Sequence, residues 1–196
     1  MFLDADEIIT PSVKREISAA LHDTYHQGFL LSYTNYFLGR RLSGGFPLRK
    51  LLLFRVGDIE HERIEEDNWS QCDMEVHEHP IAQGSVGLMR NRIDHRDLRG
   101  MDSYMRKHNE YAAWEARLLH LTRYSSLRKN SLSTQQRLKC SLLSSRHGGF
   151  MYFLGSYFVM GGWKDGSIGF AFAMLKACYF KQVACRLEEL ELNSKA

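Results

Sequence analysis

Near its start the chain reads Phe2-Leu3-Asp4-Ala5-Asp6-Glu7-Ile8-Ile9-Thr10-Pro11, and this stretch carries two structural signals. The apolar pair Phe2-Leu3 predicts the end of a buried strand. Thr10 and Pro11 predict the start of a helix, because a threonine hydroxyl accepts a free backbone N–H and proline fits the first helical position. A strand that leads through an acidic turn into a helix is typical of an α/β fold.

Apolar periodicity extends this interpretation along the chain. Val13, Ile17, Ala20 and Leu21 share one helical face, and we expect this helix to stop at Gly28. The pattern further predicts strands at 29–38 and 51–56, a turn at 39–47, an acidic loop at 58–67 and a glycine-rich hairpin at 81–90.

The second half of the sequence predicts helices. A long helix starts at Asp102 or Ser103 and continues through Leu119 with regular spacing of apolar residues. A basic, serine-rich helix is expected within 125–147. Two short aromatic helices within 150–180 are divided by a Gly-rich turn, and an acidic helical stretch at 186–192 follows.

Composition limits the classes of protein that fit. The 196 residues have 44% hydrophobic and 25% charged content, which is globular and allows one domain or one domain with an appendage. A net charge of +3 argues against a nucleic-acid partner. The four cysteines include no Cys-x-x-Cys pair, and no signal peptide is evident, so we expect free thiols in a reducing, cytoplasmic compartment.

Two acidic or histidine-rich segments are candidates for chemistry. Asp4 and Asp6 could bind a divalent ion such as Mg²⁺ or Mn²⁺, which prefers oxygen ligands, although such pairs often occur in surface turns. Glu78 lies between His77 and His79 and could be a general base or belong to a metal site; the alternative is a polar strand end. His95 follows the predicted hairpin and could reach the same cleft.

The tail combines basic and aromatic residues. Residues 90–147 hold thirteen Lys and Arg against five Asp and Glu, and the aromatic segment 150–180 follows directly. These features predict a surface that lies on, and does not cross, an anionic membrane. The alternative is that the aromatic side chains close the core of the domain.

Seven short segments form an ordered series of motifs. They are 3–7 with Thr10-Pro11, 35–40, 53–55, 76–80, 86–95, 107–116 and 162–166. In this order they resemble the motifs of family 2 glycosyltransferases, in the branch that builds lipopolysaccharide core and exopolysaccharide. The resemblance covers nearly the whole chain.

This resemblance implies a GT-A fold, which is Rossmann-like. It also implies that the N-terminal nucleotide-binding half of the family's fold is missing, so we expect a truncated enzyme that is inactive alone. Residues 1–98 would be a partial catalytic domain. Residues 99–196 would be a mostly helical, membrane-proximal region with an interfacial segment at 150–180.

The resemblance also implies roles for individual residues. Glu78 would deprotonate the acceptor hydroxyl, and Asp4, His77 and Arg55 would bind substrate. A second implied set, Asp6 and His95, would hold the divalent metal (Mg²⁺ or Mn²⁺). The substrates would be a nucleotide-sugar donor and a lipid-linked or saccharide acceptor, with inversion at the transferred sugar.

Two other classes of protein remain open at this point. A non-catalytic membrane-surface or assembly module would use only the basic helices and the aromatic tail. A metal-dependent hydrolase would use the His and Glu residues, but their spacing matches no zinc pattern. For the transferase and for the module we expect a peripheral location on the inner face of the cell membrane.

Overall fold

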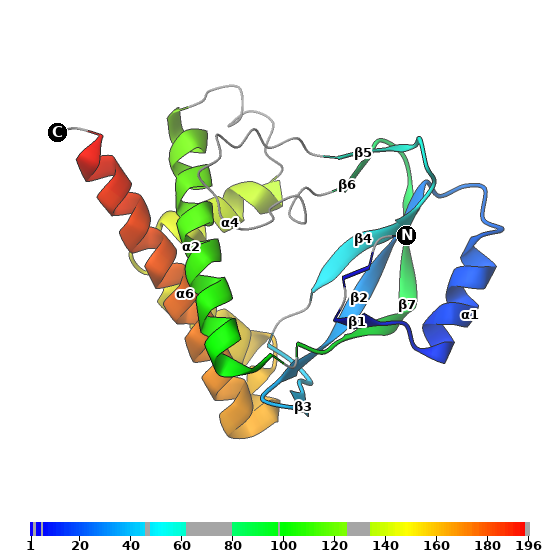
Figure 1. The fold of residues 1–196 in the computed structure, drawn as a ribbon, viewed down its shortest axis with the longest axis horizontal. Coiled ribbons are helices and arrows are strands. Elements are labelled where there is room, and N and C mark those ends of the chain that lie inside the picture. The colour runs from blue at the N-terminus through cyan, green and yellow to red at the C-terminus, as the bar shows by residue number, and fades with distance from the viewer. Residues whose placement is uncertain are drawn as a thin grey trace. The chain divides into compact units, whose positions relative to one another are not determined.

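The computed structural model describes residues 1, 3–4, 6–45, 48–61, 80–97, 99–124 and 134–194. The chain divides into two compact units (Figure 1). The sheet unit comprises Met1–Leu42 and Phe46–Leu98, and the helical unit comprises Ser43–Gly45 and Arg99–Ala196. The protein is therefore a mixed α/β chain, as the sequence predicts.

The sheet unit contains seven strands and one helix among its described residues. In chain order they are β1 (Glu7–Ile8), α1 (Pro11–Ala20), β2 (Gly28–Phe37), β3 (Arg40–Arg41), β4 (Arg49–Phe54), β5 (Ile59–His61), β6 (Pro80–Ala82) and β7 (Val86–His95).

The long strand β2 organises the larger, mixed sheet. One edge of β2 pairs in parallel with β7, from Gly28 opposite Val86 to Asn35 opposite His95. Its other edge pairs antiparallel with β4 and β3. Strand β1 pairs antiparallel with the far edge of β7, and β5 pairs with β6 in a separate two-stranded sheet.

A bulge in β7 is stabilised from α1. Between Leu30 and Ser32 the partner strand advances from Leu88 to Arg92, so β7 contains two extra residues at this point. The Glu16 carboxylate accepts the backbone N–H of Arg90 at 2.6 Å. A bulge interrupts the hydrogen bonds between neighbouring strands. The Glu16 side chain therefore accepts backbone N–H groups of β7 that β2 leaves without an acceptor.

Helix α1 packs on the sheet through a small apolar core. Val13, Leu31 and Ile93 are fully buried there, with the side chains of Leu52 and Met89 nearly so. The hydroxyl of Thr10 accepts the N–H of Val13 at 3.4 Å, which confirms the predicted cap, and Pro11 is the first helical residue.

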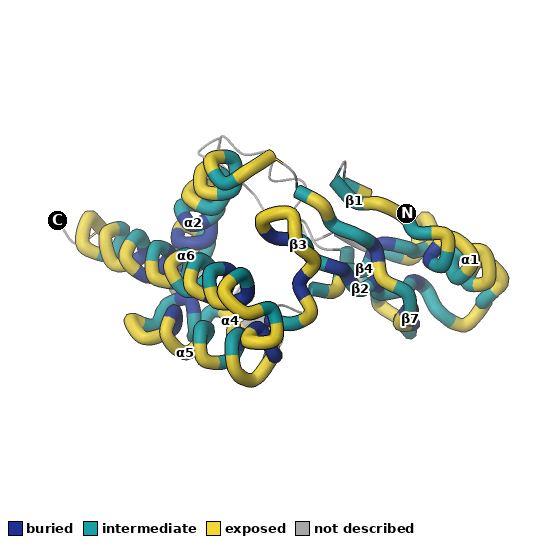
Figure 2. The backbone as a smooth tube through the Cα atoms, turned by 90° about the horizontal axis from the view of Figure 1, so that it is seen from below, coloured by how far each residue is buried: buried dark blue, intermediate teal, exposed yellow. Residues whose placement is uncertain are grey.

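The helical unit is built from the second half of the chain. Its elements are α2 (Gly100–Tyr124), α4 (Thr134–Ser144), α5 (Gly148–Leu154), a π-helical turn (Gly155–Val159), a 3₁₀ turn (Gly162–Asp165) and α6 (Gly166–Asn193). Buried and exposed residues alternate along α6 (Figure 2). The core of the helical unit is formed by α2, α4 and α6. It consists of Ala112, Ala116, Leu119, Leu143, Val183 and Leu187.

Residues 43–45 are anchored to the turn before α6. The Asp165 carboxylate accepts the N–H groups of Ser43 at 2.9 Å and Gly44 at 3.1 Å. Gly45 donates its N–H to the carbonyl of Met160, and its own carbonyl accepts the hydroxyl of buried Ser156. A Cβ on Gly44 would lie 2.5 Å from the carbonyl oxygen of Gly161, so this close approach requires glycine.

Several sequence predictions of secondary structure are confirmed. The strands at 29–38 and 51–56 correspond to β2 and β4, and the long helix corresponds to α2. The aromatic segment does contain two helical pieces separated by a turn. The predicted helix within 125–147 is α4 where it is described.

Other predictions are wrong in detail. Residues 81–90 do not form a hairpin, because β6 pairs with β5 while β7 pairs with β2 and β1. The first helix ends at Ala20, well before Gly28, and Leu21 is exposed. Helix α2 begins at Gly100, so neither predicted cap starts it. The acidic stretch 186–192 is the end of α6 and no separate helix.

Candidate active site

The pairing of β1 with β7 brings Asp6 next to His95. Glu7 lies opposite His95 in the antiparallel register, and the N–H of Arg96 donates to the carbonyl of Asp6 at 2.9 Å. Asp6 therefore precedes a short strand; Leu3 is outside any strand, so the predicted strand end before the acidic pair is not observed there. The β1–β7 register therefore places two predicted metal ligands, Asp6 and His95, next to each other, although they are far apart in the sequence.

The distance between these two side chains suits a shared cation. Asp6 Oδ2 lies 3.5 Å from His95 Nε2, and both side chains are partly accessible. Two ligands that each bind one ion at about 2.1 Å are about 3.0 to 3.5 Å apart for angles between about 90° and 110°. The donor set, one carboxylate oxygen and one imidazole nitrogen, thus fits a divalent metal such as Mn²⁺.

Asp4 takes part in a neighbouring charged cluster. Its Oδ2 lies 3.3 Å from Lys50 Nζ, and its backbone N–H donates to Glu7 Oε2 at 3.2 Å. The Glu7 side chain is only 1% exposed, and Lys50 Nζ also lies 3.9 Å from its Oε1. Lys50 is therefore the cation that balances two carboxylates, one of them fully buried.

The three carboxylates together produce a negative potential within the unit. Burial raises the pKa of the Tyr33 hydroxyl, and the carboxylates of Glu7, Asp4 and Asp6 raise it further. The Tyr33 ring meets the His95 ring edge to face, with 5.9 Å between centroids. A cation at Asp6 and His95 would lie in this field.

A fourth acidic residue, Asp94 at this end of β7, is already bonded. Asp94 Oδ2 accepts the Tyr36 hydroxyl at 3.3 Å and the Arg96 guanidinium at 2.8 Å. The hydrogen bond to Asp94 raises the pKa of Arg96 further above its usual range. These bonds hold the end of β7 just after His95.

Within the described part of the chain, no group of three or more His, Cys, Asp or Glu side chains is placed to hold a metal ion. The predicted base Glu78 and the predicted substrate ligand His77 lie outside the described residues. The described residues on either side of their segment, His61 and Pro80, pair with each other in the β5–β6 sheet.

Arg55 is not brought to the Asp6–His95 pair. It follows Phe54, which pairs with Gly28, and Gly28 pairs with Val86 at the start of β7. His95 is at the other end of β7, and a ten-residue strand spans about 30 Å.

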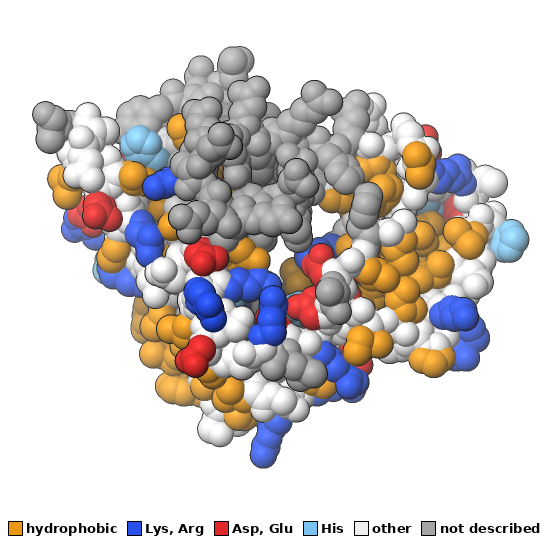
Figure 3. Space-filling view, viewed as in Figure 1, with side chains coloured by type: hydrophobic (Ala, Val, Ile, Leu, Met, Phe, Trp, Pro, Cys, Tyr) orange, Lys and Arg blue, Asp and Glu red, His pale blue; other side chains and the backbone are white. Residues whose placement is uncertain are grey.

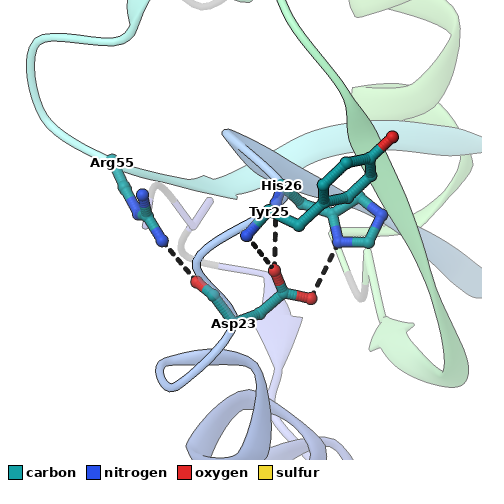
Figure 4. A network of polar contacts seen from close by, with 4 residues as sticks. All are labelled: Asp23, Tyr25, His26 and Arg55. Atoms are coloured by element: carbon teal, nitrogen blue, oxygen red, sulfur yellow. Dashed lines mark hydrogen bonds and ion pairs between the residues drawn. The ribbon is translucent and has the colours of Figure 1, made fainter.

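The Arg55 guanidinium instead donates to the backbone carbonyl of Asp23 (Figure 4). The Asp23 carboxylate accepts the backbone N–H groups of Tyr25 at 2.7 Å and His26 at 2.9 Å, and contacts His26 Nδ1 at 2.8 Å. The hydrogen bonds from His26 lower the pKa of Asp23 to about 2. In this structure Arg55 thus secures the turn between α1 and β2.

Sequence reasoning missed the residues that support the acidic site. Glu7, Tyr33 and Lys50 had no assigned role, although all three contact or face Asp4 and Asp6. Lys50 lies in β4, one residue before the strand that the sequence predicts at 51–56. Its partner is defined by sheet pairing, which the sequence pattern does not contain.

Comparison of the chain with protein-family models, with curated proteins and with solved structures found no match.

Proposed function

We propose that the sheet unit carries part of the active site of a metal-dependent, inverting glycosyltransferase. The substrates would be a nucleotide-sugar donor and a lipid-linked or saccharide acceptor of lipopolysaccharide or exopolysaccharide synthesis. The observation that carries this proposal is the 3.5 Å approach of Asp6 Oδ2 and His95 Nε2. Both residues belong to motifs that resemble those of family 2 glycosyltransferases.

Asp6 and His95 would hold Mg²⁺ or Mn²⁺. When bound, such an ion neutralises charge that develops on the leaving diphosphate. Asp4, which already shares Lys50 with Glu7, would orient the donor through its remaining acceptor capacity. Tyr33 supports the imidazole of His95 from the side and keeps its ring next to Asp6.

Glu78 would act as the general base in this proposal. A carboxylate near the acceptor hydroxyl takes its proton as the oxygen attacks the sugar, and the nucleoside diphosphate leaves with the bonding electron pair. This role rests on the sequence motif Val76-His77-Glu78-His79-Pro80.

A Mn²⁺ titration of the full chain tests the metal site directly. Binding should be measurable by the electron paramagnetic resonance signal of free Mn²⁺. Both Asp6→Ala and His95→Ala should weaken binding at least tenfold, because each removes one of two protein ligands. Asp58→Asn, an exposed acid elsewhere in the sheet unit, is the matched control and should bind as the wild type does. Equal affinity in all four proteins would overturn the metal site.

A hybrid enzyme tests the transfer reaction itself. Residues 1–98 of this chain would replace the corresponding region of an active family 2 glycosyltransferase. Sugar transfer that is lost with Asp6→Ala and on removal of divalent metal would support the proposal. A folded hybrid that transfers sugar equally with Asp6→Ala would exclude it.

A second candidate function, the non-catalytic membrane-surface module, is favoured by a different observation. Large apolar side chains are exposed together on the helical unit. Such a surface supports binding to a membrane or partner without any requirement for catalysis.

A further inference from the structure

An exposed apolar face lies on the helical unit, along α5, the π-helical turn, the 3₁₀ turn and the first part of α6. We call it the tip face. Its members are large side chains at least 37% exposed: Phe150, Met151, Leu154, Phe158, Val159, Met160, Trp163, Phe170 and Met174. Part of such a surface is visible in Figure 3 as apolar side chains over the N-terminal half of α6.

Contacts between aromatic rings make this face continuous. Phe158, in the π-helical turn, and Phe170, in α6, both pack edge to face on the ring of Tyr157, with centroids 5.1 and 5.6 Å away. Phe153 contacts both as well. These rings therefore join an exposed side chain of the π-helical turn to one of α6. Contiguous apolar patches of this kind on soluble proteins mark interaction sites.

The segment that carries the tip face is mainly basic. Between residues 148 and 183 Asp165 is the only acidic residue, whereas Lys164 and Lys181 are basic; the third lysine, Lys176, faces His108 inside the unit. The Asp165 carboxylate is occupied by the N–H groups of Ser43 and Gly44. Lys164 and Lys181 are exposed, and Lys164 Nζ lies 5.8 Å from the Trp163 ring. An apolar, aromatic patch with basic residues complements an anionic lipid surface.

The opposite end of α6 is committed to the protein core. Val183 and Leu187 are buried against α2 and α4, and Arg186 donates to Asn109 of α2. Among the described residues one helical stretch, Gly162–Asn193, is long and apolar enough to cross a membrane, a test that the core helix of a soluble protein also passes. The packing of its C-terminal half favours contact through the tip over a full crossing.

We propose that the tip face docks on the surface of an anionic lipid bilayer. Trp163, Phe158 and Val159 enter the headgroup boundary, while Lys164 and Lys181 meet lipid phosphates. Lysines near such a surface are attracted to its anionic headgroups, and salt screens this attraction. This inference is independent of the metal site and of glycosyl transfer.

Flotation of the full chain with vesicles tests the docking surface. One set of vesicles is phosphatidylcholine, and the other is phosphatidylcholine mixed with phosphatidylglycerol. The wild type should float with the mixed vesicles at low salt, and less at high salt. The double variant Phe158→Asp/Val159→Asp should lose at least tenfold in binding. Leu192→Asp, an equally exposed leucine at the far end of α6, is the control and should float as the wild type does.

Other outcomes would overturn the proposal. A folded wild-type chain that floats with neither vesicle excludes lipid docking, and equal binding to both vesicles excludes anionic recognition. Concentration-dependent self-association that is lost in the double variant, without flotation, would show that a second copy covers the face. Circular dichroism of each variant verifies that it is folded, and Lys164→Glu, which leaves the apolar residues intact, should also weaken flotation.

Discussion

The Glu16 carboxylate binds both N–H groups of Asn91, the backbone N–H at 2.9 Å and the side-chain amide at 2.8 Å. This contact fastens α1 to the bulge of β7, the strand that ends at His95. Burial alone would raise the pKa of Glu16, but the hydrogen bonds from Arg90 and Asn91 lower it overall from its usual value of 4.5.

Glu16→Gln should destabilise the sheet unit. The change weakens charge-assisted hydrogen bonds, so we expect a loss of about 1 to 2 kcal/mol at neutral pH in urea unfolding. Because the folded-state pKa is lowered, this contribution is present above pH 4.5 and is lost as the pH falls through the folded pKa. The difference between wild type and variant should therefore shrink in acid. Glu189→Gln, an exposed change on α6, should cost much less at every pH.

Asp165→Ala should release residues 43–45 from the helical unit. Two backbone N–H groups lose a charged acceptor, so stability should fall by about 1 to 3 kcal/mol. Hydrogen exchange of the Ser43 and Gly44 amides should become faster than in the wild type. Ser43→Ala retains the donating backbone N–H and should change neither quantity; an equal effect of both variants would contradict this account.

Lys176 should make the stability of the helical unit depend on pH. Burial, with a smaller effect of Lys107, lowers the pKa of Lys176 from 10.5 to about 8. Its Nζ lies 3.0 Å from His108 Nε2, whose Nδ1 meets the carbonyl of Tyr104 at 2.9 Å. A carbonyl only accepts, so Nδ1 carries the proton and Nε2 accepts from Lys176.

Between about pH 8 and 10.5 the unfolded chain binds this proton and the folded chain does not, so stability should rise with pH. The rise is at most about 1.4 kcal/mol per pH unit. Urea unfolding from about pH 7.5 to 9 measures it, before much tyrosine, with its usual pKa of about 10, is ionised. Lys176→Met should abolish this contribution, and Lys181→Met, an exposed change on the same helix, should retain it. Parallel curves for wild type and Lys176→Met would refute the assignment.

Glu78→Gln, tested in the hybrid enzyme, should lower turnover by about 10²-fold or more, because a general base is lost. The KM for the donor should stay close to that of the parent hybrid, since the base contacts the acceptor. Unchanged turnover would indicate that the general base is Asp73, Glu75 or Asp94 instead. Of these, Asp94 already accepts hydrogen bonds from Tyr36 and Arg96.

Local signals in the sequence predicted local structure well. Thr10 and Pro11 predicted the start of α1, and aromatic, β-prone composition predicted β2. The pairing of the strands was predicted less well. The segment 81–90 looks like a hairpin because its glycines suit a turn, yet β7 gains more by pairing along most of β2. Long-range pairing depends on the whole sheet, which periodicity within one segment does not report.

The candidate site likewise combines residues that the sequence indicated with residues that only the fold identifies. Asp6 and His95 were assigned to one metal through family resemblance, and the β1–β7 register does bring them together. Arg55 was grouped with the substrate ligands, and strand order places it about a strand length away from His95. Lys50 and Tyr33 belong to none of the motifs, and Glu7, although it ends the first motif, was given no role, because their importance comes from neighbours that only the fold supplies.

The attachment of residues 43–45 to the helical unit imposes an order on biosynthesis. These residues leave the ribosome early, whereas Ser156, Met160 and Asp165, which bind them, are synthesised more than a hundred residues later. Until then the N–H groups of Ser43, Gly44 and Gly45 are hydrated, and the loop between β3 and β4 lacks its anchor. A nonsense or frameshift mutation that removes residues from 156 onward would therefore leave residues 43–45 without their anchor, far from the mutation in sequence.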